Sequence, residues 1–446
     1  MKKTLIMAMV VLCFVPASFA TLVTNMNQSA QYFRLLSRNA STDIDAVFYN
    51  PAGLTLLKDG WHVALYNQTI FQEKTVTNDF YFLNTKKYVG EVNVPIFPDF
   101  YAVYKKNRLA LSFGFGPNSG GGTADFKKGL PAFETQISTL PYMLSHMGLP
   151  TTQYSVDIAF KGKSVFYGFQ MNASYAFSEM FAAAFGMRYI SAENSYVGHI
   201  RNIMINPRHP LLNPTGAMLS ASQFFALIGQ SYYAAATRDM EVDVEQTGTG
   251  FTPLLSLSLH PAEGLNIGIK YEFITKLKLT NKTTKDDVGM FPDGEVIHND
   301  IPAILSLGVA YDLTTKLHAS ISYNMFFDKD ANWDGREKFV ESNSWDLGVG
   351  VEYDVLNALT ISAGYLRTKF TLASGYQSDL AHDMSANSFG FGARIRLGQK
   401  LDLDLSGLYS AYEKPEKQIA YPGIGTFLEK YERTNVAFAV GFGYHF

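Results

Sequence analysis

The chain has 446 residues, of which 17% are charged and 14% aromatic, and its formal net charge at pH 7 is −3. So weak a charge predicts neither nucleic-acid binding nor strong electrostatic attraction of a charged partner. The one cysteine, Cys13, lies in a segment that we expect to be removed, which excludes disulfides, thiolate metal sites and a cysteine nucleophile from the mature protein.

Residues 1–20 have the features of a secretory signal peptide. Two lysines precede an apolar stretch from Leu5 to Val15, and small residues occupy the cleavage region. A transmembrane anchor is the alternative, but the stretch is too short to span a bilayer. After residue 20 no stretch has the length and apolarity of a membrane helix, so a membrane location would require a closed β-barrel.

Residues 21–58 lack sustained alternation, whereas apolar side chains recur at every second position in about fourteen segments of residues 59–446. Alternate side chains on a strand face opposite ways, so each segment predicts a strand with one apolar face and one small or polar face. Clear apolar sets are Leu255, Leu257 and Leu259; Leu305, Leu307, Val309 and Tyr311; Trp345, Leu347, Val349, Val351 and Tyr353; Phe389, Phe391, Ala393, Ile395 and Leu397.

The links between these segments alternate in length. Short links lie near residues 105–108, 178–180, 261–264, 314–316, 354–357 and 398–400, and long links fill 72–96, 117–162, 196–249, 278–299, 329–342, 371–385 and 413–431. Short turns at one rim and long loops at the other are typical of an outer-membrane barrel. The predicted fold is therefore all-β, a 14-stranded antiparallel transmembrane β-barrel, rather than a soluble sandwich.

The turn at residues 398–400 lets the pairing register of its two flanking strands be predicted. If Gly398, Gln399 and Lys400 form a three-residue turn, Leu397 opposes Leu401 on the lipid side. The lumen-facing side chains would then oppose each other as two structural ion pairs, Arg396 with Asp402 and Arg394 with Asp404.

Two long links carry helical patterns. Apolar residues recur every three or four positions from Phe126 to Met147, which predicts an amphipathic helix broken near Pro141. A second apolar helical stretch is expected between Met218 and Tyr233. These helices either pack on each other and on the barrel rim, or form a hydrophobic landing site for ligand. The candidate capture residues are Phe126, Phe133, Ile137, Leu140, Phe224, Phe225, Leu227 and Ile228.

The residues Asn50, Pro51, Ala52 and Gly53, after Val47-Phe48-Tyr49, resemble the signature of the FadL family of outer-membrane transporters for long-chain fatty acids and other hydrophobic compounds. The stretches 97–104, 109–126 and 301–311 are similar to family strands. The resemblance implies a fourteen-stranded barrel whose residues 21–58 form an N-terminal hatch inside the lumen. The C-terminal Phe446 fits outer-membrane proteins generally.

In that family the third strand is kinked inward and opens a lateral gap in the barrel wall. Glycine and proline interrupt a strand ladder, and this chain supplies them at the corresponding place, although a flexible loop start would look the same. The candidate kink residues are Gly114, Gly116, Pro117, Asn118, Gly120, Gly121 and Gly122.

The chain also departs from the family pattern. The glycine- and alanine-rich run expected before the signature is replaced by residues 32–38, which include Arg34 and Arg38. The family's basic residues for a carboxylate cannot be matched one for one. Arg201, Lys276 and Lys278, in or beside long links, are candidates because basic groups bind carboxylates.

No serine-hydrolase elbow and no zinc-protease motif occurs among these residues, so we expect neither enzymatic activity nor a cofactor. The resemblance implies passive import of hydrophobic compounds, foremost long-chain fatty acids, by loop capture, hatch movement and lateral exit. A general diffusion porin, an aromatic-hydrocarbon channel and a purely structural barrel remain alternatives. Expected partners are the hydrophobic ligands, outer-membrane lipid and lipopolysaccharide, and the barrel-assembly machinery through Phe446, with no nucleic acid.

Overall fold

The structure is a computed structural model that describes residues 29–421 and 423–446. The predicted signal peptide, residues 1–20, and the first residues of the expected hatch lie outside this part of the chain. Within the described residues, no helix is both long enough and apolar enough to cross a membrane.

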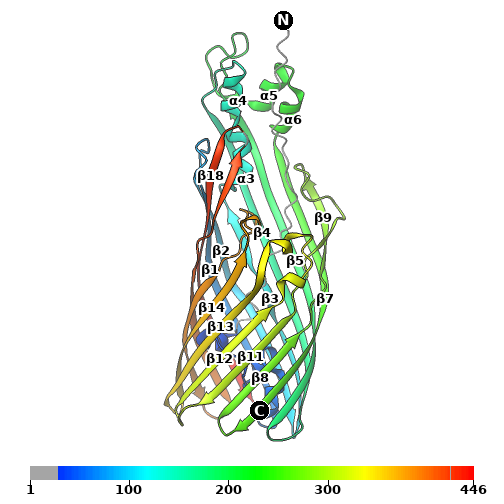
Figure 1. Cartoon of the computed structure of the whole chain (residues 1–446), viewed down its shortest axis with the longest axis vertical. Helices are drawn as coiled ribbons and strands as arrows, with labels where there is room; N and C mark the ends of the chain where they lie inside the picture. The colour runs from blue at the N-terminus through cyan, green and yellow to red at the C-terminus, as the bar shows by residue number, and fades with distance from the viewer. Residues whose placement is uncertain (1–28, 422) are drawn as a thin grey trace.

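The described chain forms one closed antiparallel barrel with fourteen strand positions (Figure 1). Strand β18 pairs with β1 and closes the ring. Three positions are each built from two strands, namely β8 with β9, β10 with β11, and β16 with β17, while β6 is a short addition to β5. The strands are β1 (Gly60–Asn78), β2 (Lys87–Lys106), β3 (Leu109–Phe126), β4 (Tyr154–Ala176), β5 (Phe181–Ile205), β6 (Leu219–Ser220), β7 (Met240–Ala262), β8 (Leu265–Glu272), β9 (Lys278–Asp286), β10 (Val296–His298), β11 (Ile304–Asp312), β12 (Leu317–Phe326), β13 (Val340–Leu356), β14 (Leu359–Leu372), β15 (Ala386–Leu397), β16 (Leu401–Tyr412), β17 (Glu416–Tyr421) and β18 (Gly425–His445).

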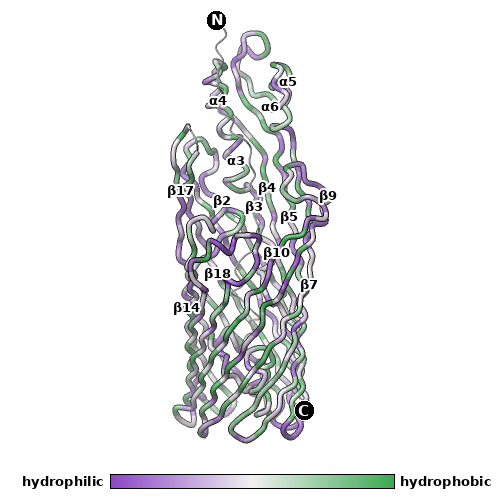
Figure 2. Tube along the Cα trace, turned by 45° about the vertical axis from the view of Figure 1, so that its right-hand side comes forward, coloured by the Kyte–Doolittle hydropathy of each residue, from purple (hydrophilic) through white to green (hydrophobic). Residues whose placement is uncertain are grey.

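The apolar faces point outward, as the alternation predicts. Leu255, Val349 and Phe391 are exposed on the outer surface, whereas their neighbours in sequence face the lumen. Hydrophobic and hydrophilic residues alternate along the lower barrel (Figure 2). A closed barrel with an exposed apolar outer surface is suited to a lipid bilayer.

The apolar band has an upper edge that can be placed on the closing strands. Phe71 and Val436, direct partners in the β1–β18 ladder, are the last exposed apolar residues there. The next outward positions are Glu73 and Thr434. Residues beyond this pair therefore lie above the lipid-facing band.

The expected loop boundaries are wrong on one side of the barrel. Parts of the predicted links 72–96, 117–162 and 196–249 are strand, because β1 to β5 and β7 contain 18 to 25 residues each. The links 278–299 and 413–431 likewise contain β9, β10 and β17. Above the lipid both strand faces meet water or loops, so the apolar alternation fades while the backbone ladder continues.

The short turns lie at the predicted positions, and the hairpin register is confirmed. Leu397 opposes Leu401, Arg396 opposes Asp402 and Arg394 opposes Asp404. Only the last pair forms the expected ion pair, at 3.1 Å. Arg396 instead pairs with Asp354 at 3.5 Å and Asp402 with His445 at 3.2 Å, because neighbouring strands offer closer partners.

The loop helices follow the predicted pattern. The chain after β3 forms two helices that break at Thr139, with Pro141 in the first turn of the second, and the later apolar stretch forms two more. Three of them stand at the upper ends of the extended strands, whereas the first, residues 131–138, lies among the upper parts of the strands (Figure 1). The helices are α3 (Pro131–Ser138), α4 (Leu140–His146), α5 (Ala221–Leu227) and α6 (Ser231–Ala236), with 3₁₀ turns η2 (Asp328–Asp330), η3 (Arg336–Phe339) and η4 (Ser374–Tyr376).

The N-terminal segment, residues 29–58, lies inside the lower barrel as helices α1 (Ala30–Leu35) and α2 (Ala46–Tyr49) and the 3₁₀ helix η1 (Pro51–Leu56). Inward glycines let its backbone touch the wall, because a Cβ at each would lie 2.0 to 2.5 Å from a backbone atom of the segment. These glycines are Gly268, Gly308, Gly348, Gly364 and Gly390. The wall is therefore shaped to the segment on five of the six successive strands β8, β11, β12, β13, β14 and β15.

Candidate functional site

Four hollows lie along the barrel interior, and the first three make up the candidate ligand path. The rim pocket lies between the upper ends of β4, β5 and β7, the lumenal cavity lies above helix α1, and the wall pocket lies beside helix α2. The lower cavity lies near the short turns.

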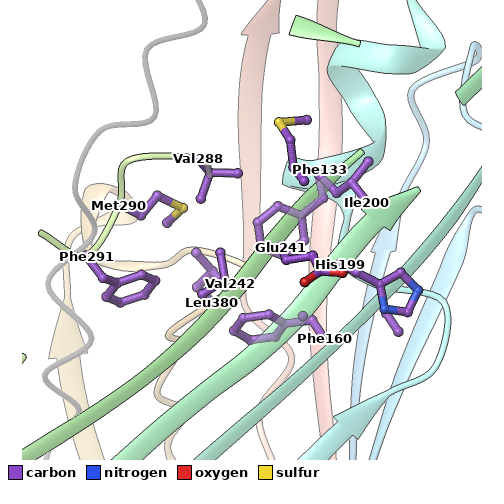
Figure 3. A pocket seen from close by; sticks show the side chains of 13 residues that line it. Phe133, Phe160, His199, Ile200, Glu241, Val242, Val288, Met290, Phe291 and Leu380 are labelled. Atoms are coloured by element: carbon purple, nitrogen blue, oxygen red, sulfur yellow. The ribbon is translucent and has the colours of Figure 1, made fainter. Parts of the chain in front are cut away.

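The rim pocket is almost wholly apolar. Phe133 of α3, Phe160 of β4 and Ile200 of β5 face Met290 and Phe291 from the link after β9 (Figure 3). At its edge Glu241 pairs with Arg201, and His199 Nε2 lies 3.4 Å from Asp157 but has no hydrogen-bond partner in the described structure. The predominantly apolar lining suits a hydrocarbon ligand.

The predicted capture residues mainly pack against one another. Phe126, Phe133, Ile137, Leu140, Phe224 and Phe225 are buried members of one hydrophobic cluster, and Ile228 packs on it. Leu227 alone among the predicted set is strongly exposed, at 69%. Only Phe133 lines the rim pocket, so these helices form its support more than an open surface.

The basic candidates lie away from the hollows. Arg201 pairs with Glu241, Lys276 lies 2.8 Å from Asp300, and Lys278 is exposed at the start of β9. None of the three lines any of the four hollows.

The Asn-Pro-Ala-Gly signature ties the N-terminal segment to β4 and β7. The Asn50 amide donates to Ser41 O (3.0 Å) and accepts from Ser256 Oγ (3.0 Å), and Ser174 Oγ donates to Pro51 O (2.7 Å). Ala52 N donates to Ser256 Oγ (3.3 Å). A Cβ at Gly53 would lie 2.3 Å from Ser41 O, so this position accepts only glycine without a shift.

Of the two arginines that depart from the family pattern, Arg34 anchors the segment to the opposite wall, and Arg38 forms its ion pairs within the segment. Arg34 Nε lies 3.1 Å from Asp404 Oδ1, and Arg394 bridges Asp404 (3.1 Å) and Asp43 (2.6 Å). Arg38 Nε donates to Asp45 Oδ2 at 2.6 Å. Burial alone would raise the pKa of Asp43, but Arg394 and Arg38 hold it well below its usual range. The cations of the lower lumen are thus neutralised by carboxylates.

The ladder between β2 and β3 is interrupted. Val92 pairs with Ala124 and Phe100 with Phe115, but between them residues 93–99 of β2 form no cross-strand pair with β3. On its other side β3 shifts register against β4 at Pro117/Ser119 and at Gly120/Gly122. The predicted kink residues Gly116, Pro117, Asn118, Gly120, Gly121 and Gly122 lie in this unpaired stretch, and Gly114 is paired just below it.

Two of these glycines have left-handed backbone conformations, with φ of 91° at Gly120 and 84° at Gly122. L-residues rarely adopt such angles, so glycine is what allows β3 to leave the ladder here.

The wall pocket lies directly behind this interruption. It is lined by Val47 and Phe48 of the N-terminal segment, by Gly114, Gly116 and Asn118 of β3, and by Tyr101, Phe115, Gly168, Gln170 and Arg188. Asn118 is 1% exposed, and neither polar atom of its amide has a partner in the described structure. The wall pocket therefore touches both the N-terminal segment and the unpaired stretch of β3.

Sequence reasoning missed the rim pocket and the lumenal cavity, because their linings come from six or more segments far apart in the chain. The sequence did contain one indication of the rim pocket. Phe160 and Ile200 are inward apolar residues on the parts of β4 and β5 that lie above the lipid-facing band. Among the described residues, no group of three acidic, histidine or cysteine side chains could hold a metal ion.

No family model matches the chain, and no curated protein matches its sequence. Solved structures do match. A Pseudomonas aeruginosa FadL homologue has 14% identity and a TM-score of 0.66, over 96% of this chain and all of that one. The toluene transporter TodX of P. putida has 14% identity and a TM-score of 0.58, over 91% of this chain and 94% of its own. The CymD monoaromatic hydrocarbon channel has 14% identity and a TM-score of 0.55, over 96% and 99%. The chain therefore shares the fourteen-stranded fold of these FadL-type barrels.

Proposed function

We propose that this protein is an outer-membrane transporter that passively imports hydrophobic compounds, foremost long-chain fatty acids. The observation that carries the proposal is the arrangement of the hollows: an apolar rim pocket above the membrane, a lumenal cavity below it, and a wall pocket behind the unpaired β2–β3 stretch. The names of the matching structures, a FadL homologue and toluene transporters, support the same class of ligand.

In this proposal ligand first enters the rim pocket. Burial of each methylene contributes about 0.8 kcal/mol, so a long acyl chain needs no strong polar contact to be captured there. The ligand then passes to the lumenal cavity, whose floor is formed by Tyr32 and Leu36 of the N-terminal segment.

Residues 29–58 act as the hatch in this proposal. Their ion pairs to Asp404 and their contacts with the wall glycines oppose a straight path to the periplasm. Helix α2 lines the wall pocket, so a small displacement of Val47 and Phe48 would widen the way to the β2–β3 interruption. The ligand would leave sideways into the bilayer, which spares its hydrocarbon chain a crossing of the polar lower cavity.

A diffusion porin is the main alternative, because it has the same kind of barrel. A porin needs a water-filled channel through the lumen, whereas residues 29–58 lie across the lower lumen here, packed against the barrel wall. Conductance of the purified protein in planar bilayers separates the two functions: we expect no open-pore current with small ions, and a steady porin-like current would favour the alternative.

A disulfide across the interruption tests the lateral route. An ideal Cβ at Gly122 lies 3.7 Å from Val94 Cβ, which suits a disulfide. We expect the double variant Val94→Cys/Gly122→Cys to import less labelled oleate when oxidised than after reduction in the same cells. The two forms of one variant are compared because a side chain at Gly122, with φ of 84°, strains the backbone in both.

The matched control is Val92→Cys/Ala124→Cys, a directly paired position just above the interruption. Its disulfide should leave uptake unchanged, since the strands are already joined there. Equal uptake by the oxidised and reduced forms of the first variant, with the disulfide verified, would rule out lateral exit.

A further inference from the structure

The link between β14 and β15 folds into the upper lumen. Residues 373–385, which we call the inner loop, belong to no strand, yet every side chain from Tyr376 to Ser385 is buried or partly buried. Leu380 and Met384 pack in the hydrophobic cluster that also contains residues of helix α3 and the aromatic residues of the rim pocket. Connecting segments normally run over the surface, so a loop with this much burial is part of the interior of the lumen.

The inner loop borders both upper hollows. Leu380 lines the rim pocket (Figure 3), whereas Asp383 and Met384 line the lumenal cavity. No residue lines both hollows, and among the described elements the inner loop is the one that contributes to each. A ligand that moves from the rim pocket to the lumenal cavity therefore passes residues 380–384.

The buried part of the inner loop is closed on itself. Gln377 donates from Nε2 to Asp383 O (2.8 Å) and accepts at Oε1 from Asp383 N (3.1 Å). The Tyr376 hydroxyl donates to Asp383 Oδ2 (2.8 Å). A compact loop that is joined by its own side chains is built to move as one unit.

Three cations from other elements hold the inner loop by its carbonyl oxygens. They are donors from η3, β18 and β17: Arg336 Nη2 to Tyr376 O (3.0 Å) and Ala381 O (2.7 Å), Arg433 Nη2 to His382 O (2.9 Å), and Lys417 Nζ to Gln377 O (2.7 Å). The Arg336 guanidinium also lies 4.1 Å from the centre of the Tyr376 ring. Hydrogen bonds from charged donors are strong, but these are side-chain contacts and not a strand ladder. The inner loop can therefore be released without opening the barrel wall.

A further contact connects the inner loop to the rim pocket. Asp379 Oδ2 accepts from Ala132 N (2.7 Å) in the first turn of helix α3, and Phe133 of the same turn lines the pocket with Leu380. Asp379 and Leu380 are neighbours in the chain, as are Ala132 and Phe133. A hydrocarbon that enters the rim pocket therefore touches both sides of this contact.

We propose that the inner loop is a gate between the rim pocket and the lumenal cavity, which a ligand in the rim pocket displaces. The inference rests on the proposed transport function and adds to it a regulated step between capture and release. Filling the rim pocket pushes Leu380 away from Phe133, which breaks the Asp379 contact and lets the inner loop move aside. Capture and passage are then separate steps, and the inner loop controls the second.

A cysteine pair tests the gate in both directions, because the only native cysteine lies in the segment that we expect to be removed. Ala132→Cys/Asp379→Cys removes the carboxylate contact, and a short bismaleimide crosslinker rejoins the two positions, which the 2.7 Å contact places close together. We expect uptake of labelled oleate by cells to fall about tenfold after crosslinking, and uptake before crosslinking to match or exceed that of the unmodified protein. The purified crosslinked barrel should still bind oleate, since the rim pocket lies before the gate.

The matched control is Val340→Cys/Leu372→Cys, direct partners in the β13–β14 ladder at the base of the inner loop. Its crosslinking should leave uptake unchanged, because the strands are already joined there. Equal uptake by the crosslinked and uncrosslinked forms of the first pair, with the crosslink verified by mass spectrometry, would overturn the gate. An equal loss of uptake in both crosslinked pairs would overturn it too.

Hydrogen exchange of the purified full-length barrel gives a second test that does not depend on crosslinking. Exchange of residues 376–384 should rise when oleate binds, because ligand in the rim pocket releases the inner loop. Arg336→Gln should raise it without ligand, whereas Lys338→Gln, an exposed neighbour, should not. Oleate binding with unchanged exchange would overturn the gate and leave transport intact. If the unmodified barrel neither binds nor imports oleate above an unrelated porin, the transport proposal itself fails.

Discussion

The lower and upper lumen use the same residue types in opposite ways. In the lower lumen Arg34 and Arg394 are buried against Asp404, and the ion pairs connect the N-terminal segment to the wall. In the upper lumen Lys74 and Arg433 are direct partners in the closing ladder, and Arg433 contacts the His382 carbonyl oxygen and the Tyr412 ring instead of a carboxylate that the described residues pair with it. A buried cation paired with a carboxylate joins two elements firmly, because removing either partner leaves a buried charge unpaired.

The largest expected effect comes from removing the carboxylate that two lower cations share. Asp404 is fully buried and accepts from both Arg34 and Arg394. Asp404→Ala should cost about 3 kcal/mol in the free energy of unfolding, because it leaves buried Arg34 with Glu352 as its remaining carboxylate and buried Arg394 with Asp43. Denaturant unfolding monitored by tryptophan fluorescence would measure this cost.

The control for that variant is Asp402→Ala, two residues away on β16, whose partner is the partly exposed His445. It should cost less than about 1 kcal/mol. If both variants have the same free energy of unfolding, the ion pairs of Asp404 do not anchor the N-terminal segment to the wall.

The next effect comes from the inward glycines. A Cβ at Gly390 would lie 2.0 Å from Phe33 O, so Gly390→Ala should displace helix α1 and cost about 1–3 kcal/mol. Hydrogen exchange of residues 29–58, read by mass spectrometry, should rise in this variant. Gly443→Ala is the control, since its Cβ would meet only Asp402 Cβ at 3.9 Å. Unchanged exchange in the Gly390 variant would contradict the close fit.

A smaller effect tests which apolar surface of the upper half captures ligand. Val288 lines the rim pocket, and Val288→Glu would place a charge among its apolar side chains. We expect oleate affinity to fall about tenfold, or about 1.4 kcal/mol. Leu211→Glu, at an 88% exposed loop position, should have no effect. The reverse result would restore the exposed loops as the landing site.

The smallest effect is the acid sensitivity of the lower anchor. The folded-state pKa of Asp43 is lowered, so its pairing stabilises the structure above the ordinary aspartate pKa near 4 and is lost as pH falls below that value. Exchange of residues 29–58, corrected for intrinsic rate, should therefore rise between about pH 4 and pH 2. Asp43→Asn should flatten this response, and an unchanged profile in that variant would assign the acid response to other groups.

The features that were predicted correctly from the sequence are those that depend on residues close together in the chain. The period-two pattern on Leu305, Val349 and Phe391 requires strands with one lipid-facing side, and Gly398 with its neighbours requires the turn that set the register of Arg394 and Asp404. The sequence prediction was less accurate above the membrane, where strands such as β5 continue to Ile205 without an outward apolar face to mark them.

The candidate site divides in the same way. The sequence by itself determined the barrel, the turn rim, and the glycines that break the third strand, because alternation and glycine content act through neighbouring residues. Only the tertiary structure decided that Arg34 would meet Asp404, that Gly390 would admit the Phe33 carbonyl, and that Lys74 would face Arg433. Those pairs join positions more than 350 residues apart, and barrel closure brings them together, so no local pattern records them.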